Sequence, residues 1–128
     1  MLNSVLLPLL DILIGVDLGD VILAGANLSN AKLLWASLRR AKLSYANLNG
    51  AILHGADLEG AIMNSVDLSH ADLGNAKLCG VNLLVRLDYA GFQGADLGNA
   101  ILTDATFDGT DLSNANLMGQ VSVGLHSS

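Results

Sequence analysis

The sequence predicts a solenoid, a coil in which short turns of chain stack on one another. Three observations support this prediction. A large apolar residue recurs at every fifth position along almost the whole chain, a small residue usually precedes it by two positions, and most charged and amide side chains stand at the positions between them. A period of five fits neither the 3.6-residue period of an α-helix nor the alternation of a strand, whereas fixed self-similarity of this kind is typical of stacked repeats.

The large residue of each repeat, here called the central residue, is apolar throughout. Central residues stand at Leu13, Leu18, Leu23, Leu28, Leu33, Leu38, Leu43, Leu48, Leu53, Leu58, Met63, Leu68, Leu73, Leu78, Leu83, Leu87, Phe92, Leu97, Leu102, Phe107, Leu112 and Leu117. Two positions earlier the chain carries alanine in most repeats and valine in several. Because both positions restrict side-chain size, we expect both to point inward. The predicted core stack includes Leu28, Leu48, Leu58, Leu68, Phe92 and Phe107.

Several repeats share one local sequence. Ala26-Asn27-Leu28, Ala46-Asn47-Leu48 and Ala56-Asp57-Leu58 each read alanine, then asparagine or aspartate, then leucine. This pattern resembles the pentapeptide-repeat family over residues 11–119. The resemblance implies an all-β fold, a right-handed quadrilateral β-helix with four repeats per turn and about five to six turns. With a rise of about 4.8 Å per turn, such a rod would be about 25 Å tall.

The chain divides into three predicted segments. Residues 1–10 are apolar and are expected to cap the first turn, residues 11–119 form the repeats, and residues 120–128 form a polar carboxyl-terminal tail. The first basic residue is Lys32, so the amino terminus lacks the basic region of a secretory signal. The mean hydropathy of +0.49 is attributed to the core, because no apolar run approaches the ~20 residues of a membrane-spanning helix.

The repeat frame slips once. Central residues Leu83 and Leu87 are four positions apart instead of five. One interpretation is a deletion tolerated at a corner of the coil. The other is a kink that exposes Leu84, Val85, Arg86 and Tyr89 as a partner-binding feature.

Outward positions carry apolar residues on two sides of the predicted rod. With 20 residues per turn, and with a correction for the slip, one outer face holds Ile22, Tyr45, Ile62, Leu84 and Ile101. The opposite face holds Ile12, Leu34, Trp35 and Ile52. Contiguous exposed apolar residues mark association surfaces. We therefore expect one of these faces, with Trp35 included among the candidates, to bind another protein or a second copy of this chain.

Charge and residue chemistry argue against several other functions. The net charge is −6, and one basic group, Lys32, Arg39, Arg40 and Lys42, is expected to be a solvated belt beside Asp17, Asp20, Asp57 and Glu59. This does not favour direct binding to nucleic acid. The histidines are dispersed at positions 54, 70 and 126, and Cys79 is the only cysteine. We therefore predict no catalytic site, no metal site and no cofactor.

Two functions remain as hypotheses. The first is a non-enzymatic scaffold that presents a flat face to a protein partner. The alternative follows from the resemblance, because some acidic members of the family mimic duplex DNA and bind or protect DNA gyrase. The resemblance also implies a bacterial, especially cyanobacterial, source and a cytoplasmic location, with the periplasm or the thylakoid lumen as less favoured locations.

Overall fold

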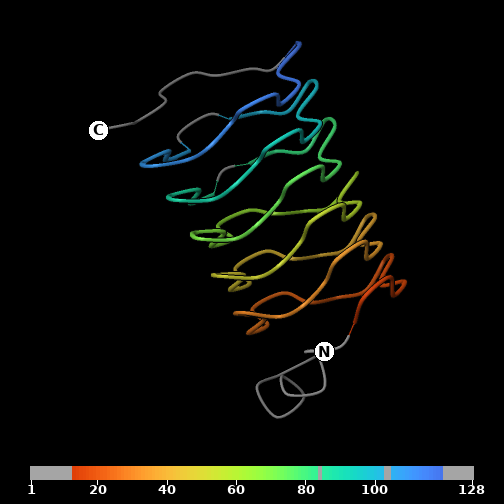
Figure 1. Ribbon diagram of the computed structural model, residues 1–128. Coiled ribbons are helices and arrows are strands. Elements are labelled where there is room, and N and C mark those ends of the chain that lie inside the picture. The colour runs from red at the N-terminus through yellow and green to blue at the C-terminus, as the bar shows by residue number, and fades with distance from the viewer. Residues whose placement is uncertain (1–12, 84, 103–104, 120–128) are drawn as a thin grey trace.

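The chain winds as a stack of similar turns from its amino-terminal to its carboxyl-terminal end (Figure 1). This computed structural model describes residues 13–83, 85–102 and 105–119; the predicted cap 1–10 and the predicted tail 120–128 lie outside these residues. The described part contains isolated parallel β-bridges and no helix. Bridged residues such as Asp17 and Ser37 are 20 positions apart. One turn therefore holds four repeats, and the predicted right-handed quadrilateral β-helix is confirmed.

Backbone hydrogen bonds join each turn to the turns on either side. The amide of Leu48 donates to the carbonyl of Asp67 in the next turn at 2.8 Å, and the amide of Asn47 donates to Ala26 in the previous turn at 2.9 Å. The same two bonds recur in most repeats. Buried backbone groups need partners, and this ladder supplies them without a continuous strand.

Each corner of the coil is a tight turn. The amide of Ala51 donates to the carbonyl of Leu48 at 3.0 Å, which closes a four-residue β-turn. The third residue of that turn, the fifth of each repeat, has a positive φ between 56° and 73° in every complete repeat described. A positive φ at this place is the mark of a type II turn. Glycine occupies many of these positions, whereas Trp35, Tyr45 and Tyr89 occupy three others.

Where an aspartate or asparagine precedes the central residue, its side chain often stabilises the turn that follows. Asp67 accepts a hydrogen bond on its carboxylate from the backbone amide of Ser69 at 2.9 Å. Such Asx turns are a common way for a short polar side chain to satisfy a nearby amide. The same bond is made by Asp17, Asn27, Asn47, Asp57, Asp72, Asp96, Asp111 and Asn116.

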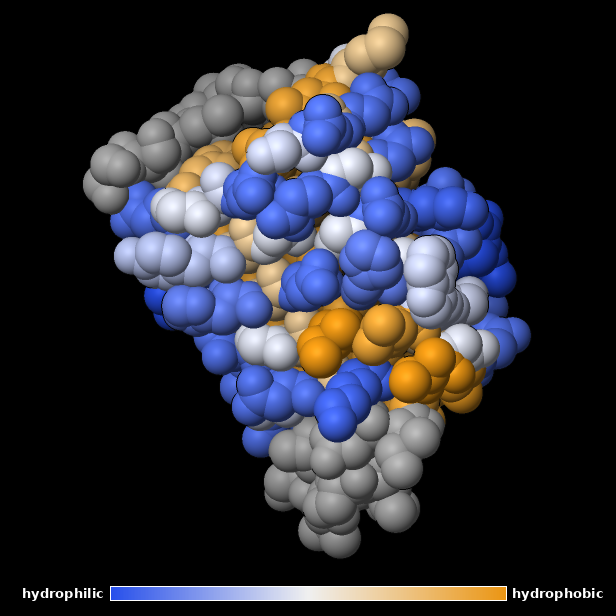
Figure 2. All heavy atoms as spheres, viewed as in Figure 1, coloured by the Kyte–Doolittle hydropathy of each residue, from blue (hydrophilic) through white to orange (hydrophobic). Residues whose placement is uncertain are grey.

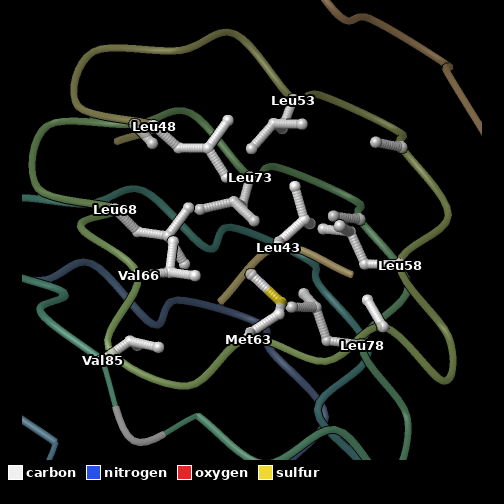
Figure 3. Close-up of a cluster of buried hydrophobic side chains, with 14 of the residues drawn as sticks. Leu43, Leu48, Leu53, Leu58, Met63, Val66, Leu68, Leu73, Leu78 and Val85 are labelled. Atoms are coloured by element: carbon white, nitrogen blue, oxygen red, sulfur yellow. The ribbon is translucent and has the colours of Figure 1, made fainter. Parts of the chain in front are cut away.

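The central and small residues fill the inside of the coil. In Figure 3 the leucines of consecutive repeats converge on the axis, together with Met63 and Val66. Within the predicted stack, Leu48, Leu58, Leu68 and Phe92 are fully buried and Leu28 is 1% exposed. Phe107 departs from this prediction and is only partly buried, because it belongs to the last described turn and no further described turn covers it.

The frame slip changes the register of the whole stack. Bridges that cross it join residues 19 positions apart, as in Asp67 to Arg86, and the offset returns to 20 at Arg86 to Thr106. The slip does not expose all the residues proposed for a kink. Val85 is 5% exposed, so its predicted exposure was wrong, whereas Tyr89 is 60% exposed. Leu84 lies outside the described residues.

Near the slip, the ladder of backbone hydrogen bonds is interrupted between residues 60–63 and residues 79–82; we call this interruption the open seam. In the preceding turn the amide of Leu43 donates to Ile62 at 2.8 Å and the amide of Ile62 donates to Ala41 at 2.9 Å. The corresponding amides of Met63 and Asn82 make no backbone hydrogen bond to another described residue. Met63 stands where most repeats have leucine, and its flexible side chain suits an irregular space.

Restoring the frame should therefore stabilise the fold. Insertion of one glycine between residues 84 and 85 supplies the missing fifth position and allows the ladder to close. We expect the free energy of unfolding to rise by about 1–2 kcal/mol, because each recovered hydrogen bond contributes about 0.5–1.5 kcal/mol. Denaturant titration followed by circular dichroism measures the change. The same insertion between residues 80 and 81, where the frame is intact, is the control and should destabilise the protein.

Candidate interaction surface

The four sides of the coil carry different side chains. We name them by their content, in the order in which the chain visits them. The charged face comprises residues 16–20, 36–40, 56–60, 76–80, 95–99 and 115–119, and the isoleucine face comprises 21–25, 41–45, 61–65, 81–83 and 100–102. The polar face comprises residues 26–30, 46–50, 66–70, 85–89 and 105–109. The tryptophan face comprises residues 13–15, 31–35, 51–55, 71–75, 90–94 and 110–114. The isoleucine and tryptophan faces are two repeats apart and therefore lie on opposite sides of the rod.

The isoleucine face brings together four of the predicted surface residues. Ile22 is 54% exposed, Ile62 46%, Ile101 36% and Tyr45 73%. The three isoleucines occupy the bridge position that precedes the central residue, so their side chains project from the flat part of the face. Leu84, which was predicted to join them, lies outside the described residues. The described part of this face thus carries three exposed isoleucines in one column, which we call the strip.

Bridges fix the order of residues along this strip. Ile22 bridges to Lys42, Lys42 bridges to Ile62, and Asn82 bridges to Ile101. The step from Ile62 to Asn82 coincides with the open seam and has no bridge. Lys42 is exposed and forms no ion pair within the described part of the chain.

Trp35 belongs to the tryptophan face and is not near the isoleucine strip. It is 59% exposed, and its ring meets the ring of His54 edge-on with a centroid separation of 5.4 Å. The indole also covers Gly55 of the next turn, where a Cβ atom would come within 2.1 Å of the ring. Trp35 is therefore held by its own chain, which makes it less available to a partner. Ile12, predicted for this face, lies outside the described residues.

Aromatic residues at the corners carry backbone strain. Trp35, Tyr45 and Tyr89 have φ values of 58°, 64° and 60°. This left-handed conformation costs about 1–2 kcal/mol for a residue with a Cβ atom. Trp35 contacts Gly55 and Tyr89 stacks on His70 at 5.0 Å, so both have a partner within the chain. Tyr45 is the most exposed of the three and makes no ring contact within the described residues.

The charged face neutralises its own arginines. Arg39 contacts Asp57 and Glu59, both at 2.9 Å, and Arg40 contacts Asp20 at 2.9 Å. The hydrogen bond from Arg40 lowers the pKa of the Asp20 carboxyl below its usual value. Burial raises the pKa of Asp57, but hydrogen bonds from Arg39 and from the amide of Glu59 outweigh it, so the pKa is lowered. The predicted solvated belt is confirmed for these residues.

The polar face is less open than the sequence suggested. Ser69 directly follows the central residue Leu68, a position that the repeat pattern turns outward, yet it is 4% exposed and its hydroxyl has no hydrogen-bond partner within the described chain. His70 and Tyr89 stack nearly parallel, with an interplanar angle of 9°. The sequence placed Tyr89 among the residues that a kink would expose, but it did not predict the stacking on His70. Its position at a corner, where side chains project outward, was the available signal.

Reactive side chains do not converge in the described chain. Residues 13–83, 85–102 and 105–119 contain no group of three histidine, cysteine or acidic residues that could hold a metal ion. Cys79 is a free thiol and is half-buried. His126 lies outside the described residues. The same described ranges contain no helix long and apolar enough to cross a membrane.

Figure 2 shows one face of the molecule. Apolar side chains gather there over the first turns, next to the grey amino-terminal residues, while most of the turns above them carry polar side chains. Apolar exposure is therefore uneven along the rod as well as around it.

Comparisons with known proteins agree with the geometry. The family described as Pentapeptide repeats matches eight copies over residues 12–34, 31–69, 46–83 and 85–119. A pentapeptide repeat protein, Rfr23, from the cyanobacterium Cyanothece 51142 is 33% identical, with 90% of each chain covered and a TM-score of 0.71. No curated protein matches the sequence.

Two further solved structures are more distant. A pentapeptide repeat protein from the Arabidopsis thaliana thylakoid lumen is 29% identical over 83% of this chain and 61% of its own, with a TM-score of 0.40. QnrB1, a plasmid-mediated fluoroquinolone resistance protein, is 18% identical over 84% of this chain and 65% of its own, with a TM-score of 0.38. At these scores neither structure bears on the function of this chain.

Proposed function

Because the chain belongs to the pentapeptide-repeat family, and its interior is filled by stacked leucine and alanine side chains, we propose that it is a non-enzymatic scaffold that binds a protein partner. A filled core leaves no internal pocket for a substrate. The flat outer faces remain as the surfaces on which a partner can be recognised.

One observation supports the isoleucine face as the binding surface. Ile22, Ile62 and Ile101 project from alternate turns of one flat side, with Lys42 and Asn82 on the turns between them and Tyr45 at the adjacent corner. Isolated apolar residues are normal on protein surfaces, whereas several apolar residues aligned on one flat face are typical of an interface. Trp35 on the opposite face is packed over Gly55 and is a weaker candidate.

The alternative, a DNA mimic that binds gyrase, has less support. Such mimicry needs a column of unpaired negative charge that resembles phosphate spacing. On the charged face Arg39 and Arg40 lie among the carboxylates of Asp20, Asp57 and Glu59 and pair with them. Inhibition of gyrase supercoiling at submicromolar concentration of this protein would favour the alternative.

We place the protein in the cytoplasm, on the evidence of its single cysteine. Cys79 is a free thiol. A free thiol is more common in reducing compartments than in oxidising ones. Fractionation of cells that produce the tagged protein, with periplasmic and cytoplasmic marker proteins, tests this location.

The scaffold proposal predicts that two surface substitutions abolish partner binding. Ile22→Lys together with Ile62→Lys adds charge to the strip but leaves the core unchanged, because both side chains are about half exposed. Affinity capture from native lysate with wild type and the variant, followed by mass spectrometry, measures the effect. We expect a partner that wild type retains and the variant loses.

The matched control carries the same two changes on the opposite face. Ile14→Lys together with Ile52→Lys alters charge equally on the tryptophan face. This control should retain the partner, and circular dichroism should show all three proteins folded. Equal partner profiles for wild type and both variants would reject the isoleucine face as the binding surface.

A further inference from the structure

We propose that the isoleucine face binds a second copy of this chain, with the two rods antiparallel about a two-fold axis that passes beside Ile62. This inference rests on the proposed function, because it names the partner of the same face. The evidence for it is the order of residues along the strip.

The order of apolar and polar residues along the strip is the same in both directions. Along the rod, the bridge positions of this face are Ile22, Lys42, Ile62, Asn82 and Ile101. Isoleucine occupies the centre and both ends, and a polar residue lies between each pair. A two-fold interface brings one surface patch against itself, so it requires this kind of self-complementarity.

An antiparallel two-fold axis satisfies every position of the strip. The axis lies in the contact plane and crosses the rods, so it reverses the order of turns while each column of residues still faces itself. Ile62 then meets Ile62 of the second copy, and Ile22 meets the second copy's Ile101. Lys42 meets the second copy's Asn82, whose amide oxygen accepts a hydrogen bond from the ammonium group.

A parallel arrangement of the same strips is disfavoured by charge. It would bring Lys42 of one copy against Lys42 of the other, and neither ammonium group has an acidic partner within the described residues. Like charges in contact oppose association and select against a competing geometry. In the antiparallel pair the aliphatic stem of Lys42 packs between isoleucines while its ammonium group reaches the wet rim.

The corner column next to the strip supports the same geometry. Its fifth positions are Gly25, Tyr45 and Ser65, and the shortened repeat 81–84 has no fifth residue. The two-fold axis places Tyr45 opposite this missing position in the second copy. Tyr45 is 73% exposed and has no ring partner within the described residues of its own chain. The strained, exposed Tyr45 is thus available for a contact with the second copy.

The available area is sufficient for such a pair. A specific interface takes about 800 Å² from each partner. The accessible surface of the chain is 6131 Å². The interface would therefore use roughly an eighth of this surface, which one of four lateral faces can supply.

Oligomeric state tests the proposal directly. Sedimentation equilibrium should show wild type as a dimer at micromolar concentration, because one face is buried by a second copy. Ile62→Lys places two like charges together on the axis and should raise the dimer dissociation constant on the order of 100-fold. The control Ile52→Lys, on the opposite face, should dimerise like wild type, and circular dichroism should show both variants folded.

Cysteine cross-linking tests the direction of the rods. In a Cys79→Ser background, the Ile62→Cys thiols of the two copies should form a disulfide with each other under mild oxidation, because residue 62 lies on the two-fold axis. Ile22→Cys alone should not, whereas a mixture of Ile22→Cys and Ile101→Cys chains should form mixed dimers. Self-linked Ile22→Cys, without mixed dimers, would contradict the antiparallel order.

A gain of affinity gives a test that unfolding cannot imitate. Asn82→Asp should tighten the dimer on the order of tenfold, because each dimer gains two ion pairs with Lys42. A monomeric wild type, or a dimer that Ile62→Lys leaves unchanged, would overturn this inference. Neither result affects the scaffold proposal, which rests on loss of a captured partner by the face variant.

Discussion

Leu58→Ala is expected to lower the free energy of unfolding by about 2–5 kcal/mol. The Leu58 side chain has no exposed surface and lies in the middle of the stack, where it points toward the axis with leucines of neighbouring repeats (Figure 3). Truncation removes apolar contacts and leaves a cavity. The stacked turns are joined by backbone ladders on several sides, so they cannot collapse easily to fill it.

Denaturant unfolding at equilibrium, followed by circular dichroism, measures this loss. Leu117→Ala is the matched control, because Leu117 is the central residue of the same column in the last described turn and is 36% exposed. Its replacement should cost about 1 kcal/mol or less, in proportion to the smaller apolar area buried there. Equal losses of unfolding free energy at the two positions would contradict a core that is packed more closely in the middle turns than in the last described turn.

Gly55→Ala is expected to destabilise the protein by about 2–4 kcal/mol through two additive effects. Gly55 has a φ of +69°, a conformation that costs about 1–2 kcal/mol once a Cβ atom is present. The new methyl group would also lie 2.1 Å from the Trp35 ring. The indole must then move from its place over the corner, which separates it from His54.

Two variants separate these effects. Gly80→Ala has the same backbone conformation, with φ of +73°, and its Cβ atom would meet nothing within 4 Å, so it should show only the conformational cost. Adding Trp35→Ala to Gly55→Ala removes the collision and should recover the remainder. Thermal or chemical unfolding of wild type, Gly55→Ala, Trp35→Ala and the double variant gives the coupling energy between the two positions, and Gly80→Ala gives the conformational cost alone. A Gly55→Ala cost no larger than that of Gly80→Ala would show that Trp35 does not rest on this corner.

Much of this architecture follows from sequence spacing. Because central and small residues recur every five positions, their burial and the assignment of the outer faces could be read from residue numbers alone. The exposed positions of Ile22 and Ile62 agree with that assignment. The two-dimensional regularity of a repeat coil makes each residue's neighbours in adjacent turns predictable, which is not the case for most globular folds.

Other features depend on interactions that spacing does not contain. The burial of Ser69 and the half-burial of Phe107 depend on which neighbouring turns and side chains cover them. The ion pairs of Arg39 and Arg40 depend on side-chain reach across turns. The missing residue near position 84 was visible in the sequence, but the open backbone seam that accompanies it was not.

The fixed repeat of 20 residues also sets the spacing of surface groups along the rod. Bridged residues upstream of the slip are always one turn apart, so any two outward groups in the same column are separated by whole multiples of about 4.8 Å. Duplicating residues 31–50 would lengthen the rod by one such step while every inward position kept its size. The added turn would fall between Ile22 and Ile62 and would displace one end of the isoleucine strip by one step. Length in this molecule is therefore set in discrete units, and a partner that spans several turns must match them.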